Sequence, residues 1–250
     1  ICKALEIVGL VNIQYATDGK EVYVIEVNPR ASRTVPILSK VTKVPMVELA
    51  VRTMLGAKLK DLGYGTGLYA KSGYYAVKVP VFSGAKLINT DIALGPEMKS
   101  TGEALGIDPD LDRALLKGFE GARIPIHTKG TVYLSVKDPD KNEETAEVIR
   151  AYIDEGFNIL ASDGTSKFLN EHGIANKTVT IDDATGIMDD VDILINVANV
   201  GNHKGTKGLR LRRKAIEKGV AVLTCMDTAE VYLKAVKLRK DNEILKYREI

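Results

Sequence analysis

The sequence predicts an α/β protein of two domains, with antiparallel strands (α+β) at residues 1–124 and a doubly wound parallel sheet at residues 125–250. The chain has 250 residues, 45% of them hydrophobic. This is enough for two cores, because single domains cluster around roughly 100 to 200 residues. The Asp18-Gly19 pair between two apolar runs is a strong hairpin signal. In the second half, strands alternate with helices, as in parallel βαβ units.

The first domain is expected to hold a hairpin, an amphipathic helix, a further strand and a glycine-punctuated segment that becomes helical. The helix has Pro45 near its start and Gly56 near its end. Its buried face should carry Val47, Ala50, Val51, Met54 and Leu55. The expected ranges are 10–16 and 21–28 for the hairpin strands, 43–59 for the helix, 73–82 for the strand and 95–122 for the last segment.

The second domain should alternate strictly between strands and helices. Its first helix is predicted over residues 140–155, with Asp140 and Glu143 as a capping box and Gly156 as its stop. The basic run within the helix at 208–219 is interpreted as a solvated face: Arg210, Arg212, Arg213 and Lys214. The strands are expected at 130–136, 157–161, 177–181, 190–199 and 220–225, and the other helices at 166–172 and 228–240.

Composition narrows the possible partners and the compartment. Lys plus Arg number 35 against 33 for Asp plus Glu, a balance that does not indicate a nucleic-acid or membrane-surface protein. No apolar run approaches the roughly 20 residues of a membrane span. Two distant cysteines without CxxC spacing are typical of a reducing compartment. We therefore expect a cytoplasmic protein with small, soluble partners.

One predicted strand ends in an unusual group of polar residues. In "VIEVNPR", alternate side chains share a face, so Glu26 and Asn28 should project the same way, about 7 Å apart. Gln14 lies on the partner strand of the predicted hairpin, within reach of the same point. Carboxylate and amide oxygens suit Mg²⁺, which completes its shell with water and substrate phosphates. This strand end is therefore a candidate metal site.

Two arginines follow the same strand end. After Pro29, Arg30 and Arg33 lie within one short loop, where guanidinium groups could clamp phosphoryl oxygens or a small carboxylate-like anion. The alternative is structural: Glu26 pairs with Arg30 or Arg33 as a salt bridge at the strand end.

These residues carry a family resemblance. The stretches "NIQYA" and "EVYVIEVNPRASRTVPILSKVTKVPMVELA" resemble the closing segment of an ATP-grasp domain, most closely that of the carbamoyl phosphate synthetase large chain. The stretch "LGPEMKSTGEALGID" resembles the segment that follows the second ATP-grasp domain in that family. Residues after 125 resemble the methylglyoxal-synthase-like domain that ends the same chain. The order of the three segments agrees, so the resemblance covers nearly all 250 residues.

The resemblance implies a reaction and roles for particular residues. Gln14, Glu26 and Asn28 would coordinate Mg²⁺ or Mn²⁺ bridging the ATP phosphates, and Arg30 and Arg33 would lie beside the phosphoryl-transfer site. The reaction would be phosphorylation of carbamate by ATP, for which metals and arginine clamps are suitable groups. The implied partners are the upstream part of the large subunit and a glutamine amidotransferase small subunit. Arginine and pyrimidine synthesis both stay open as pathways.

The chain starts abruptly within periodic structure at Ile1, without a Met. We therefore expect it to be a piece of a longer polypeptide. In the family, the segments that hold the adenine and cover the triphosphate lie upstream. The isolated chain is thus expected neither to bind ATP tightly nor to make carbamoyl phosphate.

The second domain has a candidate anion site in "FNILASDGTSKFL". Ser162 and Thr165 flank a helix start, where hydroxyls and free backbone amides attract anions, although either could simply cap the helix. By resemblance, Lys141 and Asn196 would join them around the phosphate of an allosteric nucleotide, such as UMP or IMP. The family's two threonines after the last strand are replaced here by Val197 and Ala198, and Lys177 is an uncertain match for a further lysine.

Two other classes of function are alternatives to the ligase. The chain could be a binding module only, sensing a nucleotide or ornithine while catalysis lies upstream. It could instead contain a free-standing lyase like methylglyoxal synthase. The lyase is disfavoured because its glycine-rich stretch with the catalytic Asp has no counterpart between Val179 and Asp192.

Overall fold

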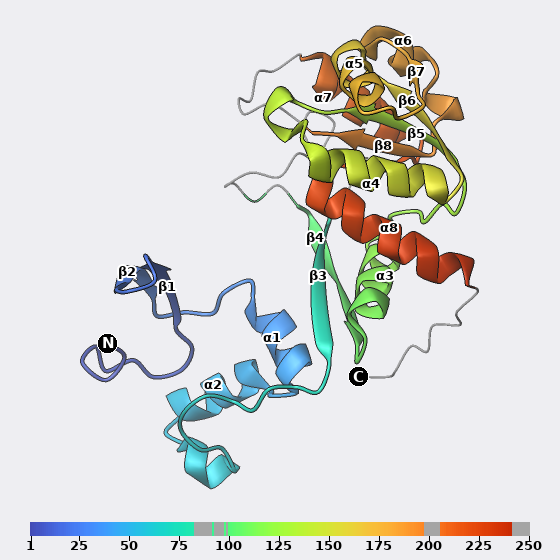
Figure 1. Cartoon of the computed structure of the whole chain (residues 1–250). Coiled ribbons are helices and arrows are strands. Elements are labelled where there is room, and N and C mark those ends of the chain that lie inside the picture. The colour runs from blue at the N-terminus through green and yellow to red at the C-terminus, as the bar shows by residue number, and fades with distance from the viewer. Residues whose placement is uncertain (83–91, 93–97, 99, 198–205, 242–250) are drawn as a thin grey trace. The chain divides into compact units, whose positions relative to one another are not determined.

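A computed structural model describes residues 1–82, 92, 98, 100–197 and 206–241 (Figure 1). The chain forms two compact units, of which one begins at Ile1 and ends at Gly73 and the other begins at Tyr74. The predicted fold class is confirmed, with two antiparallel two-stranded sheets and one parallel five-stranded sheet. The compact units divide at a different place from the predicted boundary at 124, which stays a prediction. None of the described helices is long and apolar enough to span a bilayer.

The first unit contains the predicted hairpin and two short helices. Its elements are β1 (Asn12–Thr17), β2 (Val22–Asn28), α1 (Val35–Thr42), α2 (Met46–Met54) and a 3-10 turn (Leu59–Leu62). The strands pair antiparallel. The Asp-Gly signal works as expected, because Gly19 has φ of 87° and Asp18 accepts hydrogen bonds from the amides of Lys20 and Glu21. These amides lower the pKa of Asp18.

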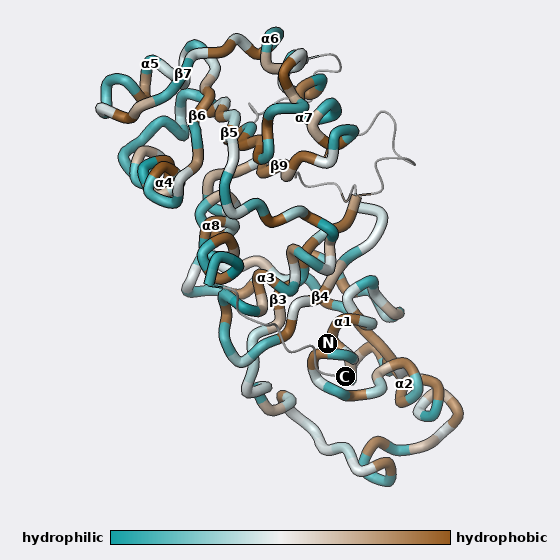
Figure 2. The backbone as a smooth tube through the Cα atoms, turned by 90° about the vertical axis from the view of Figure 1, so that its right-hand side faces the viewer, coloured by the Kyte–Doolittle hydropathy of each residue, from teal (hydrophilic) through white to brown (hydrophobic). Residues whose placement is uncertain are grey.

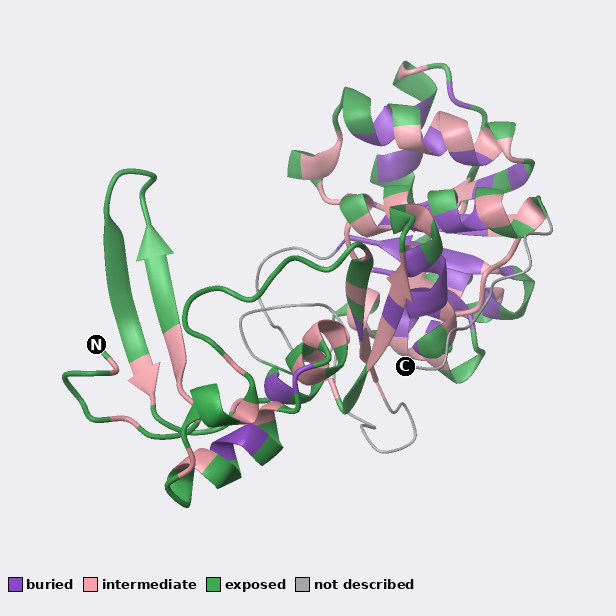
Figure 3. Cartoon of the chain, turned by 90° about the horizontal axis from the view of Figure 1, so that it is seen from below, coloured by how far each residue is buried: buried purple, intermediate pink, exposed green. Residues whose placement is uncertain are grey.

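The buried face predicted for α2 is wrong in this unit. Ala50 is buried, but Val47, Val51 and Met54 are more than half exposed, and Leu55 beyond the helix is 83% exposed. Figure 3 shows exposed residues along most of the hairpin as well. Amphipathic spacing shows which side chains share a face of the helix, but not whether another element of the unit covers that face.

The second unit begins with a hairpin backed by a helix. β3 (Tyr75–Val81) pairs antiparallel with β4 (Gly102–Asp108), and α3 (Leu111–Gly121) packs on both. The sequence did not predict β4, because two glycines fall within it. One of them explains the close packing: a Cβ atom at Gly106 would lie 1.9 Å from the carbonyl oxygen of Ala114 and 2.5 Å from the amide nitrogen of Gly118.

An ion pair joins α3 to the end of β4. The Lys117 Nζ atom lies 2.6 Å from Asp108 Oδ2, and the two side chains are 8% and 12% exposed. Burial raises the pKa of Asp108, but the hydrogen bond from Lys117 and further favourable interactions outweigh it, so the pKa lies below its ordinary value.

The rest of the second unit is the predicted doubly wound sheet. Its strand order is β7-β6-β5-β8-β9, and all neighbouring pairs are parallel. The strands are β5 (Gly130–Ser135), β6 (Phe157–Ala161), β7 (Lys177–Thr178), β8 (Ile193–Asn196) and β9 (Ala221–Leu223). The helices are α4 (Glu143–Asp154), α5 (Asp163–Glu171), α6 (Ile181–Gly186), α7 (Lys207–Glu217) and α8 (Met226–Lys240), with 3-10 turns at Asp138–Asp140 and Met188–Asp190.

Two local predictions in this sheet need correction. The cap of α4 is Asn142, whose Oδ1 atom accepts a hydrogen bond from the Thr145 amide at 2.9 Å, while Asp140 belongs to the preceding 3-10 turn. The strand predicted at 177–181 ends after two residues, because Thr180 caps α6 by accepting from the Asp183 amide. The predicted residues 198 and 199 of the next strand lie outside the described residues.

The sheet separates two apolar clusters. Val132 and Leu134 face a cluster with α3, α4 and α8, whereas Tyr133 and Leu194 face a smaller cluster with α6 and α7. Figure 2 shows both hydrophobic and hydrophilic residues in α8, which has one side in the larger cluster. Because side chains alternate along a strand, the residues two positions after Tyr133 and Leu194 point toward α7. These residues are Ser135 and Asn196.

Candidate functional site

The hairpin brings the predicted metal ligands together. Gln14 is the register partner of Glu26, and Asn12 is the partner of Asn28. Opposite residues of antiparallel strands share a face. Gln14, Glu26 and Asn28 therefore lie on one surface, as the sequence predicted. Asn12 lies on the same surface. The register shifts between Gln14 and Tyr15, because β2 carries one extra residue, Ile25, at a β-bulge.

The donor atoms of this face fit a hard divalent cation. The Asn28 Nδ2 atom donates to Glu26 Oε1 at 2.9 Å, so the two side chains already converge. One carboxylate and two amide oxygens match the oxygen preference of Mg²⁺ or Mn²⁺ once the Asn28 amide turns its oxygen inward. Glu26 and Gln14 are exposed and Asn28 is half-buried, which leaves room for substrate oxygens. The described residues contain no cluster of three His, Cys, Asp or Glu side chains placed to hold a metal.

The two arginines lie in the segment after β2. Arg30 donates from Nη1 to the Ala31 carbonyl at 3.0 Å, and both Arg30 and Arg33 are exposed. Glu26 accepts a hydrogen bond from Asn28, and the alternative salt bridge of Glu26 with Arg30 or Arg33 stays open. Their roles as phosphoryl clamps stay predictions.

A second group of polar residues gathers where three neighbouring strands end. Ser135 and Asn196 are register partners at the ends of β5 and β8, and Ser162 follows β6. The Ser162 hydroxyl lies 3.3 Å from that of Ser135. The strand order reverses at β5, because β6 and β7 follow on one side of it and β8 and β9 lie on the other, and such a switch point is where open α/β sheets bind ligands. Ser135 was not among the predicted site residues, although its place at the end of a parallel strand was a usable signal.

Thr165 is held inside the protein. It is 1% exposed, and its Oγ1 atom accepts from the Val136 amide at 3.0 Å and from the Ser162 hydroxyl at 3.1 Å. A ligand contact by this hydroxyl would require some of these bonds to be exchanged. Ser162, which is 8% exposed, lies nearer to the surface of this loop.

Lys141 lies over the start of α5. A Cβ atom at Gly164 would be 3.1 Å from Lys141 Nζ, so the ammonium group is beside the first turn of the helix. It also donates to Asp138 Oδ1 at 2.5 Å, and this bond lowers the pKa of the exposed Asp138 carboxyl. The ammonium group of Lys141, the N-terminus of α5 and the Ser162 hydroxyl are therefore grouped at this loop. Each of these groups attracts anions.

Asn196 is buried against α7. It is 4% exposed, and its Oδ1 atom accepts a hydrogen bond from Arg212, which is 3% exposed. The prediction of a solvated basic face is therefore wrong for Arg212, although Arg210 on the same helix is exposed. The residue types of a charged run do not show which member points inward.

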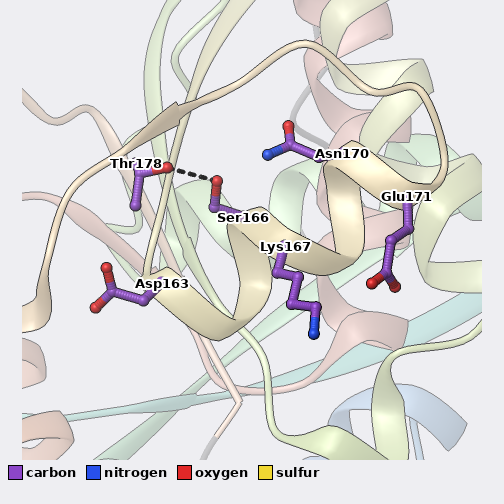
Figure 4. Close-up of a pocket in the computed structure, with 6 residues that line it drawn as sticks. All are labelled: Asp163, Ser166, Lys167, Asn170, Glu171 and Thr178. Carbon is purple, nitrogen blue, oxygen red and sulfur yellow. Dashed lines mark hydrogen bonds between the residues drawn. The ribbon is translucent and has the colours of Figure 1, made fainter.

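A separate hollow lies along α5 and the edge strand β7 (Figure 4). Its most buried side chain is Ser166, whose hydroxyl lies 2.6 Å from that of Thr178. None of the predicted ligand residues lines this hollow. The lining residues are Asp163, Ser166, Lys167, Asn170, Glu171 and Thr178.

Comparisons with known proteins agree with both units. Residues 1–62 match the family model "Carbamoyl-phosphate synthase L chain, ATP binding domain", and residues 144–224 match "MGS-like domain". The molecule therefore combines the end of an ATP-grasp domain with a methylglyoxal-synthase-like domain.

The individual relatives are carbamoyl phosphate synthase large chains. The chain is 51% identical to a carbamoyl phosphate synthase large chain of Clostridium acetobutylicum over 99% of its own length and 24% of the relative. For a large chain of Lachnoclostridium phytofermentans the values are 44%, 98% and 24%. For one of a Thermoanaerobacter species they are 45%, 94% and 22%. The chain is homologous to the carboxy-terminal region of carbamoyl phosphate synthase large chains and spans about a quarter of their length.

Proposed function

We propose that the first unit supplies the metal-binding end of an ATP site that phosphorylates carbamate to carbamoyl phosphate. The observation that carries this proposal is the register of the hairpin, which sets Gln14 opposite Glu26 with Asn28 bonded beside them. In this proposal the upstream part of a large subunit completes the ATP site. A glutamine amidotransferase small subunit supplies ammonia, in the cytoplasm. The two free cysteines of the chain are compatible with that compartment.

The protein groups would act by position and charge. Bound Mg²⁺ or Mn²⁺ would neutralise the negative charge of the ATP phosphates. Gln14, Glu26 and Asn28 would hold the metal, and the guanidinium groups of Arg30 and Arg33 would orient the transferred phosphoryl group. The pathway served by the product, arginine or pyrimidine synthesis, stays open in this proposal.

The activity test compares two proteins. The isolated 250-residue chain should make no carbamoyl phosphate from ATP, bicarbonate and ammonia. A chimaera in which these residues replace the matching quarter of the Clostridium acetobutylicum large chain should make carbamoyl phosphate. An inactive but folded chimaera would contradict the catalytic role. It would favour the alternative that the chain is only a regulatory module sensing a nucleotide or ornithine.

The second unit is proposed to bind the phosphate of an allosteric nucleotide at the ends of β5, β6 and β8. The ammonium group of Lys141 beside Gly164, the hydroxyl of Ser162 and the side chain of Asn196 support this role. These strand ends lie at the switch point of the sheet. This support for the proposal does not depend on the family resemblance.

Calorimetry tests this second role. UMP or IMP should bind the chain, and Lys141→Gln should weaken binding by about tenfold or more, because a charge-assisted contact is lost. Lys234→Gln removes the same charge from an exposed position of α8 and should leave the affinity unchanged. No heat with either nucleotide at millimolar concentration would end the proposal, and ornithine is the next probe for the regulatory alternative.

A further inference from the structure

Arg212 is a buried cation at the back of the strand-end site. Its side chain enters from α7, between the helix and the end of β8, and donates to Asn196. The packing there is tight, because a Cβ atom at Gly208 would lie 3.2 Å from Arg212 Nη1 and 3.3 Å from Asn196 Oδ1. Only glycine leaves these two side chains in contact without displacement.

The contact determines which end of the Asn196 amide faces the site. A guanidinium group has donors and no acceptor, so only the carbonyl oxygen of Asn196 can face it. The Nδ2 group must then point away from Arg212. Asn196 is 4% exposed, so its orientation is set by this buried contact. The Asn196 side chain therefore turns its two amide N–H donors away from Arg212.

The charge of Arg212 favours the same kind of ligand. A guanidinium group keeps its proton in proteins, and a buried charge acts through a medium of lower dielectric constant than water. Ser135 is the register partner of Asn196, and the Ser135 and Ser162 hydroxyls touch, so the oriented amide belongs to the site assembled by Lys141 and Ser162.

We infer that Arg212 is a positioning residue, which fixes Asn196 as a hydrogen-bond donor and so strengthens phosphate binding at the strand-end site. This inference rests on the proposed phosphate site of the second unit. It adds a residue from α7, outside the loop that the sequence identified, and assigns a direction to the Asn196 amide.

The test uses the 250-residue chain with inorganic phosphate and UMP as probes in calorimetry. Arg212→Gln should lower the affinity by about tenfold or more, because a glutamine amide can satisfy either end of Asn196. Arg212→Lys keeps a donor and a charge, so its affinity should lie between that of Arg212→Gln and that of the unsubstituted chain. Arg210→Gln removes an exposed charge from the same helix and should change the affinity by less than about twofold.

A second variant covers the case in which Arg212→Gln does not fold. Asn196→Asp keeps an acceptor for Arg212, so the chain should fold, but a carboxylate then replaces the donor and should abolish phosphate binding. Unchanged affinity in Asn196→Asp, or in a folded Arg212→Gln variant, would overturn the inference and leave the site standing. If the unsubstituted chain binds neither probe, the proposed site itself fails and the inference fails with it.

Discussion

Replacing Glu26 by Gln in the active chimaera is expected to lower the rate of carbamate phosphorylation on the order of 10³-fold. Glu26 is the one carboxylate among the predicted metal ligands, so the substitution removes their only negative charge while keeping size and shape. The loss should appear in kcat, measured as ATP-dependent carbamoyl phosphate formation at saturating Mg²⁺. Partial recovery with Mn²⁺ would be compatible with a weakened metal site.

The matched control lies in the same hairpin. Glu21→Gln makes the same chemical change at an exposed residue just before β2, and its activity should stay within about twofold. Both variants should melt at the temperature of the unsubstituted chain, because both side chains are exposed. Full activity in Glu26→Gln would exclude a metal-binding role for this face.

Replacing Gly106 by Ala is expected to destabilise the second unit by about 3 kcal/mol or more. The added methyl would meet backbone atoms of α3 at 1.9 and 2.5 Å, and backbone cannot move aside as a flexible side chain can. The measurement is urea unfolding followed by far-ultraviolet circular dichroism.

Gly102 provides the control in the same strand. An added Cβ there would find its nearest neighbour, Val81 Cβ, at 3.8 Å, which is an ordinary contact. Gly102→Ala should therefore change stability by less than about 0.5 kcal/mol. Equal stabilities for Gly106→Ala and Gly102→Ala would contradict the close packing of α3 on β4.

The sequence predicts best where local chemistry decides the structure. The hairpin follows from one turn, because Gly19 adopts a positive φ and Asp18 binds the turn amides. Once that turn is known, counting outward brings Gln14 opposite Glu26 if the one-residue bulge is allowed for. The parallel sheet follows in the same way from the regular alternation of strands and helices.

Other features depend on contacts that no local pattern contains. β4 was missed because Gly102 and Gly106 weaken a strand signal, yet the second glycine is needed for contact with α3. Arg212 looks like its exposed neighbours, and only the packing of α7 on the end of β8 shows that it is buried. The predicted buried face of α2 failed for the converse reason, since a helix can be amphipathic while its apolar side chains stay exposed.

The identity of the proposed metal-binding residues does not by itself fix the direction of their side chains, because the bulge in β2 contributes to that direction. Without Ile25 the hairpin would be regular, and the carboxylate could still face Gln14, but the strand would lose the local bend and added twist that a bulge produces. The direction of Glu26 and Asn28 is therefore a property of the backbone. A homologue could keep every ligand residue and still lose the geometry of the site through the deletion of a single hydrophobic residue.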